Sequence, residues 1–328
     1  MPASASRVWF TAGEQFQTVK RSATTPGAAL RSLLSGPTSA ERKRHVETQI
    51  PAGTTLTSVS VSGGLADIVL NGRFFRGVPR DPSARSTAQQ STLQARAGQV
   101  LFTATQFSGV TKIKLTAGGH LITTGLSRSA YGKPSMPPLT GTYDRGKPEP
   151  GTRKLQQQLA ALGYLPDDAV DGLYGYRTTQ AVLAFQAWEG LTRDGVAGPQ
   201  TKTKLATASR PEPFATGPSK RIEVDRARGV ALLIRRNMVV RAIHVSTGAG
   251  ANATPAGTFK VFRKELRSWS VPFQVWLPYA SYFNNGIAFH EYPDVPAYPA
   301  SHGCTRVPAP EAPVVYDFAT IGTTVIVR

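Results

Sequence analysis

Residues 221–248 read RIEVDRARGVALLIRRNMVVRAIHVSTG, and this stretch decides the fold of the C-terminal third of the chain. β-Branched and aliphatic residues fill two or three short runs, and Arg228-Gly229 separates the first two as a turn. Two further β-rich runs follow, TPAGTFKVFRKE at residues 254–265 and TTVIVR at residues 323–328. We therefore expect a small, mostly-β sandwich or barrel, to which short helices contribute little.

The single cysteine of the chain lies in this segment, in YPASHGCTRVP at residues 298–308. A thiolate is the nucleophilic form of cysteine, and a neighbouring imidazole can take the thiol proton. His290 is expected at a strand end, and the loop after it is long enough to return to Cys304. His302 lies two residues before Cys304 and shares its side in an extended segment. The spacing alone favours a catalytic cysteine and a buried structural cysteine equally.

Neighbouring residues add groups that such a nucleophile needs. Gly303 permits a close backbone turn, so the amides of Gly303 and Cys304 are candidates for an oxyanion site. The planar guanidinium of Arg306 is well shaped for a substrate carboxylate. Tyr279 and Tyr282 precede the histidine and either line a groove or pack in the core.

The middle of the chain is helical and repeats itself. VDGLYGYRTTQAV and RDGVAGPQTKTKL share an Asp-Gly pair, a second glycine and a threonine that opens an apolar helix. Asp171-Gly172 and Asp194-Gly195 suit turns with positive φ. Thr178 and Thr201 are predicted near helix N-termini. These loops lack the oxygen ligands of a calcium-binding EF-hand, so we expect no metal.

The N-terminal segment combines strands and helices. A short strand, a capped helix and a hairpin around Gly63-Gly64 precede a helix with apolar residues on one face and a closing strand. The apolar face is formed by Leu93, Ala97, Val100, Leu101, Ala104 and Phe107. This pattern predicts an α/β two-layer sandwich. His45 and His120 are expected at the surface, and His244 in the C-terminal segment is expected to be structural.

Composition limits the possible functions. The net charge is +18, and residues 1–150 hold 18 Lys/Arg against 7 Asp/Glu. A nucleic-acid binder pairs such charge with a groove-reading element, and none is visible, so we expect no nucleic-acid partner. One cysteine excludes an intramolecular disulfide framework and a four-cysteine zinc site. No apolar run reaches the roughly 18–20 residues of a membrane span, and no signal region follows Met1.

Two proline- and glycine-rich stretches are predicted to be linkers. The expected domains are residues 1–130, 150–208 and 218–328, separated by linkers at 131–149 and 209–217. The first domain resembles a GerMN domain through LRSLLSGP, ADIVLNGRF and QVLFTATQFSGVTKIKL. The second resembles the bacterial peptidoglycan-binding helical domain through LQQQLAALGYL and the repeated Asp-Gly motif.

The third domain resembles the YkuD-type L,D-transpeptidase domain through HVSTG, TPAGTF, YFNNGIAFH and SHGCTRV. The resemblance implies a Cys304 nucleophile, a His290 general base, and a site shaped by Ser301, His302 and Gly303, with Arg306 contacting substrate. The loop after His290 is shorter than usual in the family, and Glu291 stands where glycine is common, which could alter how His290 is oriented.

The implied reaction uses no cofactor. The nucleophile attacks a peptidoglycan stem tetrapeptide, the thioester passes to a diamino-acid amine as acceptor, and a 3→3 cross-link results. Carbapenem β-lactams are the implied inhibitors, anionic wall polymers are a possible partner of the basic N-terminal domain, and the cell envelope is the implied location. The alternatives are a catalytically silent wall-binding protein and a carboxypeptidase or cysteine peptidase of stem peptides.

Overall fold

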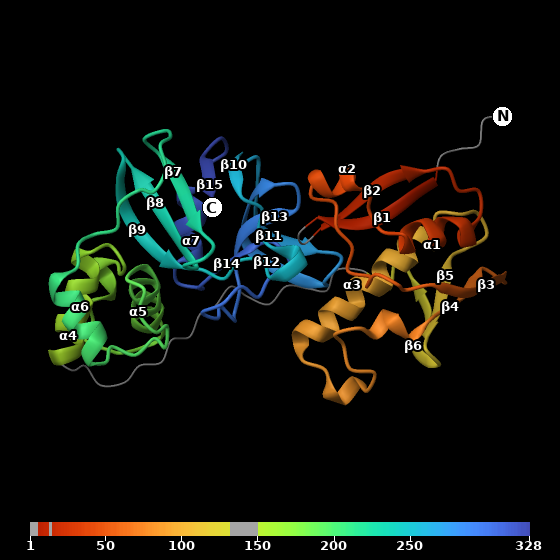
Figure 1. Ribbon diagram of the computed structural model, residues 1–328, viewed down its shortest axis with the longest axis horizontal. Helices are drawn as coiled ribbons and strands as arrows, with labels where there is room; N and C mark the ends of the chain where they lie inside the picture. Colours follow the sequence, from red (N-terminus) through yellow and green to blue (C-terminus); the bar gives the residue numbers. More distant parts are fainter. Residues whose placement is uncertain (1–5, 13–14, 132–149) are drawn as a thin grey trace. The chain divides into compact units, whose positions relative to one another are not determined.

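The computed structural model describes residues 6–12, 15–131 and 150–328 (Figure 1). They fall into two compact units, one formed by the N-terminal part of the chain with Trp269–Trp276, the other by the remaining residues. In the described part of the chain, no helix combines the length and apolar character needed to cross a membrane. The linker predicted at 131–149 lies outside the described residues, apart from Tyr131.

The N-terminal unit is an α/β arrangement, as the sequence predicted. Its elements are β1 (Ser6–Ala12), β2 (Gln15–Arg21), α1 (Pro26–Leu34), α2 (Ser39–Lys43), β3 (Leu56–Ser62), β4 (Leu65–Leu70), α3 (Thr87–Ala104), β5 (Lys112–Ala117) and β6 (His120–Ser127). A four-stranded sheet has the order β3-β4-β5-β6, in which β4 and β5 are parallel, and β1 pairs with β2 separately. The hairpin turn at Gly63-Gly64 is present, with both glycines at positive φ.

The apolar face predicted on the long helix α3 packs into the core of this unit. Val100, Leu101 and Ala104 are fully buried. Phe107 lies beyond the end of α3, because the helix ends at Ala104, but it still packs against the same cluster. His120 is exposed, whereas His45 is half-buried and adopts a positive φ.

The helical segment comprises α4 (Pro150–Ala161), α5 (Tyr176–Trp188) and α6 (Pro199–Thr207). Its internal repeat has a structural cause. Gln156 Nε2 donates to Asp171 Oδ1 and Thr178 Oγ1, at 2.8 and 2.9 Å. Gln186 makes the equivalent bonds in the second copy, to Asp194 at 2.7 Å and to Thr201 at 3.2 Å. Each buried glutamine thus ties one Asp-Gly turn to the helix that follows it.

The two threonines of this repeat lie near helix N-termini, as predicted. Gly175 and Gly198 precede the first helical residues of α5 and α6, so Thr178 and Thr201 lie inside the first turn. The Asp-Gly turns themselves have the expected conformation, since Gly172 and Gly195 have φ of 83° and 71°.

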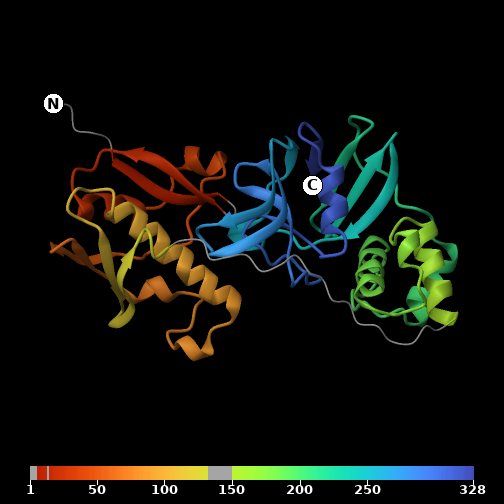
Figure 2. The ribbon, with the colours of Figure 1, turned by 180° about the vertical axis from the view of Figure 1, so that it is seen from behind.

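The C-terminal segment is mostly β. Its elements are β7 (Arg221–Asp225), β8 (Val230–Arg235), β9 (Met238–His244), β10 (Gly257–Lys260), β11 (Arg263–Ser270), β12 (Val275–Asn284), β13 (Ile287–Glu291), β14 (Thr305–Val307), α7 (Ala312–Phe318) and β15 (Thr324–Val327). One sheet has the order β10-β15-β7-β8-β9 and the other β11-β12-β13-β14. Figure 2 shows this segment from behind, in green-blue to dark blue. Helix α7 was not expected, and its Val315 and Phe318 belong to the apolar core with Phe289 and Val307.

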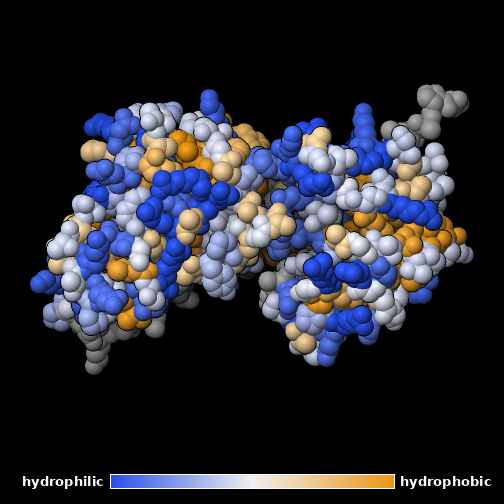
Figure 3. Space-filling view, in the orientation of Figure 1, coloured by the Kyte–Doolittle hydropathy of each residue, from blue (hydrophilic) through white to orange (hydrophobic). Residues whose placement is uncertain are grey.

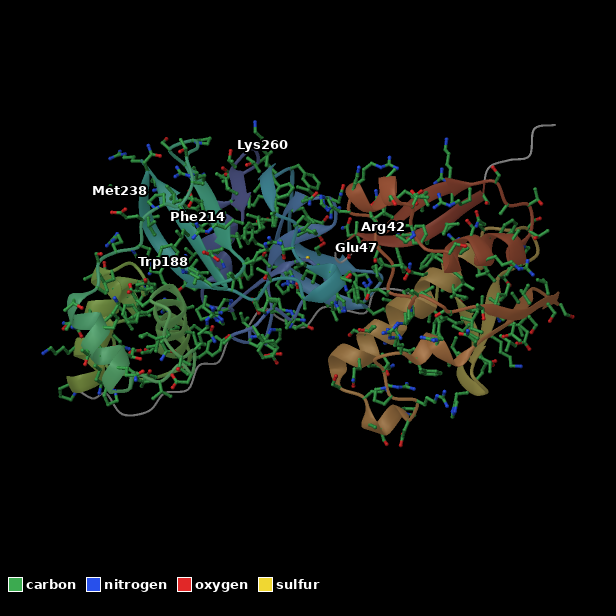
Figure 4. The ribbon with its side chains drawn as sticks, viewed as in Figure 1. Arg42, Glu47, Trp188, Phe214, Met238 and Lys260 are labelled. Atoms are coloured by element: carbon green, nitrogen blue, oxygen red, sulfur yellow. The ribbon has the colours of Figure 1, made fainter. Side chains whose placement is uncertain are left out.

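Helices and sheet share a second apolar core within this unit. Phe185 of α5 and Leu159 of α4 cluster with Leu232 of β8 and Val239 of β9, all nearly inaccessible. Trp188 lies at the end of α5 nearest the sheet (Figure 4), and the Arg228 guanidinium carbon is 4.9 Å from its ring centroid. The helical segment is therefore packed against β8 and β9 rather than separated from them.

The segment predicted as a second linker, residues 209–217, has no regular structure but is held to its neighbours. Arg210 donates to the Ala161 carbonyl at 2.7 Å and to the Val239 carbonyl at 3.2 Å. Phe214, labelled in Figure 4, lies 3.8 Å from the Arg328 guanidinium carbon. These contacts join the end of the helical segment to the five-stranded sheet β10-β15-β7-β8-β9.

Candidate active site

The parallel pairing of β13 with β14 brings Cys304 and His290 together. His290 is in register with Arg306, and Phe289 with Thr305. The amide of Ala288 donates to Cys304 Sγ at 3.4 Å, and Sγ donates to the Gly286 carbonyl at 3.6 Å, so Cys304 lies beside β13, one residue before the paired Thr305. Residues two apart on a strand share a face, and diagonal neighbours on adjacent strands are within side-chain reach. Cys304 and His290 thus occupy one face of the sheet as diagonal neighbours.

The orientation of His290 defines its chemistry. Its Nδ1 lies 2.7 Å from the main-chain carbonyl oxygen of Glu291, which can only accept, so Nδ1 carries the hydrogen. Among the described residues, Nε2 has no hydrogen-bond partner. Burial lowers the pKa of His290 to about 4, and the charge of Arg306 acts in the same direction. The imidazole is therefore neutral at pH 7, with Nε2 as an available base.

The loop before Cys304 is fixed by short-range hydrogen bonds. Ser301 Oγ donates to the Cys304 carbonyl and accepts from the Gly303 amide at 3.1 Å. The buried hydroxyl of Thr254 donates to the Gly303 carbonyl at 2.7 Å. Gly303 has φ of 116°, so the segment bends instead of running extended. The alternation argument for His302 was wrong for this reason; a role for that half-buried side chain stays a prediction.

The STG stretch at residues 246–248 supports this loop. Ser246 and Arg306 exchange main-chain hydrogen bonds of 3.1 and 2.8 Å, and Gly248 pairs with Ser301. A Cβ on Gly248 would lie only 2.8 Å from the Gly303 Cα. Glycine at 248 therefore allows the two backbones to approach closely.

Arg306 and Tyr279 have surroundings of their own. The Arg306 guanidinium carbon is 4.0 Å from the Tyr292 ring centroid, its Nη1 lies 3.4 Å from the Asp294 carbonyl, and the residue is 6% exposed. The Tyr279 ring is 5.9 Å from that of Tyr316 on α7 and packs against the core. Substrate contact by either residue stays a prediction.

The reacting side chains of the candidate site are buried. Cys304 and Tyr282 are fully buried, and His290 is 1% exposed. In residues 6–12, 15–131 and 150–328, no group of three His, Cys, Asp or Glu side chains is arranged to hold a metal ion. The arrangement holds a thiol and a neutral base on one sheet face, which suits nucleophilic attack followed by proton transfer.

Two features of the site carried no signal in the sequence. The acceptor that orients His290 is a main-chain carbonyl, so the identity of the Glu291 side chain is not what supplies it. Arg263 of β11 stacks on Tyr282, with its guanidinium carbon 3.8 Å from the ring centroid. Only the folding of β11 beside β12 brings this pair together, since the two residues are far apart in sequence.

Three family models match the chain. Residues 219–327 match an L,D-transpeptidase catalytic domain, residues 148–205 a peptidoglycan binding domain, and residues 4–123 a domain described under sporulation and spore germination. Their order along the chain is the order predicted from the sequence.

Individual relatives agree with these matches. A crystal structure of an L,D-transpeptidase from Xylanimonas cellulosilytica is 35% identical, with a TM-score of 0.50, and the alignment covers 59% of this chain and 100% of that one. An uncharacterized protein from Kitasatospora aureofaciens is 36% identical over 108 residues, 30% of this chain and 89% of its own. The N-acetylmuramoyl-L-alanine amidase CwlL of Bacillus licheniformis is 41% identical over 88 residues, 24% of each chain. The chain therefore spans about a quarter of that amidase.

Proposed function

The chain belongs to the L,D-transpeptidase family through its C-terminal domain, and from this premise we propose that it is a cysteine-dependent L,D-transpeptidase of peptidoglycan stem peptides. The observation that carries the proposal is the shared sheet face of Cys304 and His290, with Nδ1 held by the Glu291 carbonyl. That hydrogen bond leaves Nε2 as the base, which is the tautomer that a thiol nucleophile needs.

The reaction proceeds in two acyl transfers. Nε2 of His290 takes the Cys304 proton as Sγ attacks the carbonyl of the diamino acid at position three of a tetrapeptide. The C–N bond to the terminal D-residue breaks, and the imidazolium returns the proton to the leaving amine. An amine of a neighbouring stem then attacks the thioester, which re-forms the thiol and leaves a 3→3 cross-link. Water as acceptor gives the L,D-carboxypeptidase reaction instead.

Hydrogen bonds hold the backbone of the loop around Cys304 in one arrangement. Oxyanion stabilisation requires donors that are held in place before the reaction. Ser301, Gly303 and Thr254 form a closed set of hydrogen bonds that fixes the loop backbone. The Gly303 amide is engaged with Ser301 in this arrangement, so we assign Ser301 and Gly303 the role of shaping the loop.

The first experiment is intact-protein mass after incubation with a carbapenem. Acylation of Cys304 by ring opening should add one β-lactam mass to the wild type and none to Cys304→Ala. An adduct on both proteins, or on neither, would contradict a reactive Cys304 and favour the catalytically silent wall-binding alternative. Product masses from tetrapeptide stems then separate the two reactions, because transfer yields dimers and hydrolysis yields shortened stems alone.

The other segments suggest where the enzyme works. We propose that the helical segment binds peptidoglycan and that the protein acts in the cell envelope, as the matched binding domain supports. The basic N-terminal segment is a candidate for anionic wall polymers. Hydrophilic residues are spread over the face seen in Figure 3 and are not gathered in one block. Sedimentation with purified wall, with and without its anionic polymers, tests both partners.

A further inference from the structure

Arg263 presents an unused pair of hydrogen-bond donors. Its guanidinium carbon lies 3.8 Å from the centroid of the Tyr282 ring, so the group is stacked on the ring. Nη1 approaches Glu265 Oε1 at 3.5 Å. Among the described residues, Nε and Nη2 are buried and have no hydrogen-bond partner. These two atoms form one edge of the guanidinium, and such an edge binds a carboxylate through two parallel N–H···O bonds.

The stacking partner belongs to the candidate active site. Tyr282 is in register with Ala288, whose amide donates to Cys304 Sγ. Its hydroxyl lies 2.7 Å from the buried Ser268 hydroxyl. Burial raises the pKa of Tyr282 to about 12, and the neighbouring Cys304 acts in the same direction. The phenol therefore stays neutral at pH 7, and the stacked pair carries the positive charge of Arg263.

An ordinary surface ion pair does not account for this arrangement. The side chains of Arg263 and Glu265 are 37% and 38% exposed, and exposed pairs at such distances contribute little to stability. Buried donors that lack partners cost free energy, and the cost is larger on a charged group. A ligand that accepts from both atoms would remove that cost.

We propose that the Nε and Nη2 edge of Arg263 binds a carboxylate of the donor stem peptide. This rests on the proposed function, because the stem peptide is the ligand that reaches Cys304. The peptide offers carboxylates of two kinds, the C-terminal one on the leaving residue and those on side chains. Both share the chemistry that the guanidinium edge recognises, and selective amidation distinguishes them.

The test measures binding without turnover. In the full chain with Cys304→Ala, calorimetry compares a tetrapeptide stem with versions in which one carboxylate at a time is a primary amide. Adding Arg263→Gln should weaken binding of the free acid by about 10- to 100-fold, as expected for loss of charge-assisted hydrogen bonds. One amide version should bind equally to the proteins with and without Arg263→Gln, which identifies the carboxylate.

Arg267→Gln is the matched control, since Arg267 is an exposed arginine on the same strand, and it should leave the affinity unchanged. Equal weakening for the acid and every amide version, no weakening, or no binding of the tetrapeptide would overturn the proposal. The carbapenem adduct separates this result from the proposed function. An adduct without carboxylate discrimination removes only the Arg263 assignment, and discrimination without an adduct removes only the proposed chemistry.

Discussion

His244 gives the protein a stability that depends on pH. The residue ends β9 and is 2% exposed, and its Nδ1 lies 2.7 Å from Gln180 Oε1 on α5. The amide oxygen can only accept, so Nδ1 carries the hydrogen and the ring is neutral. Burial lowers the pKa of His244 to about 4, and Arg193 acts in the same direction. Protonation of this histidine must therefore destabilise the contact between α5 and the sheet.

The direction and size of this pH effect on stability follow from the difference between the pKa of His244 in the folded and in the unfolded chain. A histidine in the unfolded chain has a pKa near 6.5, so below that pH the unfolded state binds a proton that the folded state resists. The stabilisation is complete above about pH 6.5 and is lost as pH falls toward 4. With a folded pKa of about 4, the loss for His244 at about pH 5 is roughly 2 kcal/mol.

Urea unfolding of wild type and His244→Gln at about pH 7.5 and about pH 5 measures the contribution of His244 to the pH dependence of stability. The variant carries a constant offset from its altered packing, but its stability should change by about 2 kcal/mol less between the two pH values. His290 and every carboxyl group titrate in both proteins and cancel in the difference. Parallel pH profiles for the two proteins would refute the reasoning.

Three further predictions concern single residues of the C-terminal segment. Glu223→Ala should cost about 3–5 kcal/mol in urea unfolding, because it leaves the buried Arg221 without its 2.7 Å partner. Gly248→Ala should slow carbapenem adduct formation by about 10- to 100-fold in timed mass spectra, since its Cβ would clash with the backbone of Asn252, Thr254 and Gly303. The rate of adduct formation should stay constant from about pH 7 down to about pH 5, because burial lowers the pKa of His290 to about 4. A decline centred near pH 6.5, the ordinary histidine value, would contradict that last expectation.

Local sequence signals predicted the elements that depend on local chemistry. The turn at Gly63-Gly64 and the Asp-Gly turns require positive φ, which glycine supplies without strain. The buried face of α3 could be predicted because its apolar residues recur at helical spacing. Helix α7 escaped prediction because it is seven residues long, a length at which packing and not propensity determines the structure.

The strands that escaped prediction have little apolar alternation to read. Residues of β2, Gln15–Arg21, are half-buried or exposed, and the strand exists through its pairing with β1. Residues of β6, His120–Ser127, are likewise half-buried or exposed and pair with β5. Edge strands of this kind are defined by partners distant from them in space or sequence, which a short window of sequence does not contain.

The candidate site divides in the same way. Cys304 and His290 stood out because their residue types and the surrounding motif are specific. Their diagonal placement depends on the parallel register of β13 and β14, and the bend at Gly303 depends on Thr254 from a separate loop. The Arg263–Tyr282 stack carried no sequence signal because it depends on the position of β11 beside β12.

The packing of the helical segment against β8 and β9 bears on how binding to the wall would affect catalysis. A flexible tether raises effective concentration but lets the nucleophile sample many positions. Here Phe185 packs in one apolar core with Leu232, and Arg210 bonds to both the helical segment and β9. If the helical segment holds peptidoglycan as proposed, Cys304 sits at a fixed distance from the bound strand. The enzyme would then select stem peptides by their spacing along the wall. A substitution that loosens the Phe185 contact should therefore lower activity on intact wall. Lengthening the 209–217 segment in that variant should not restore the activity.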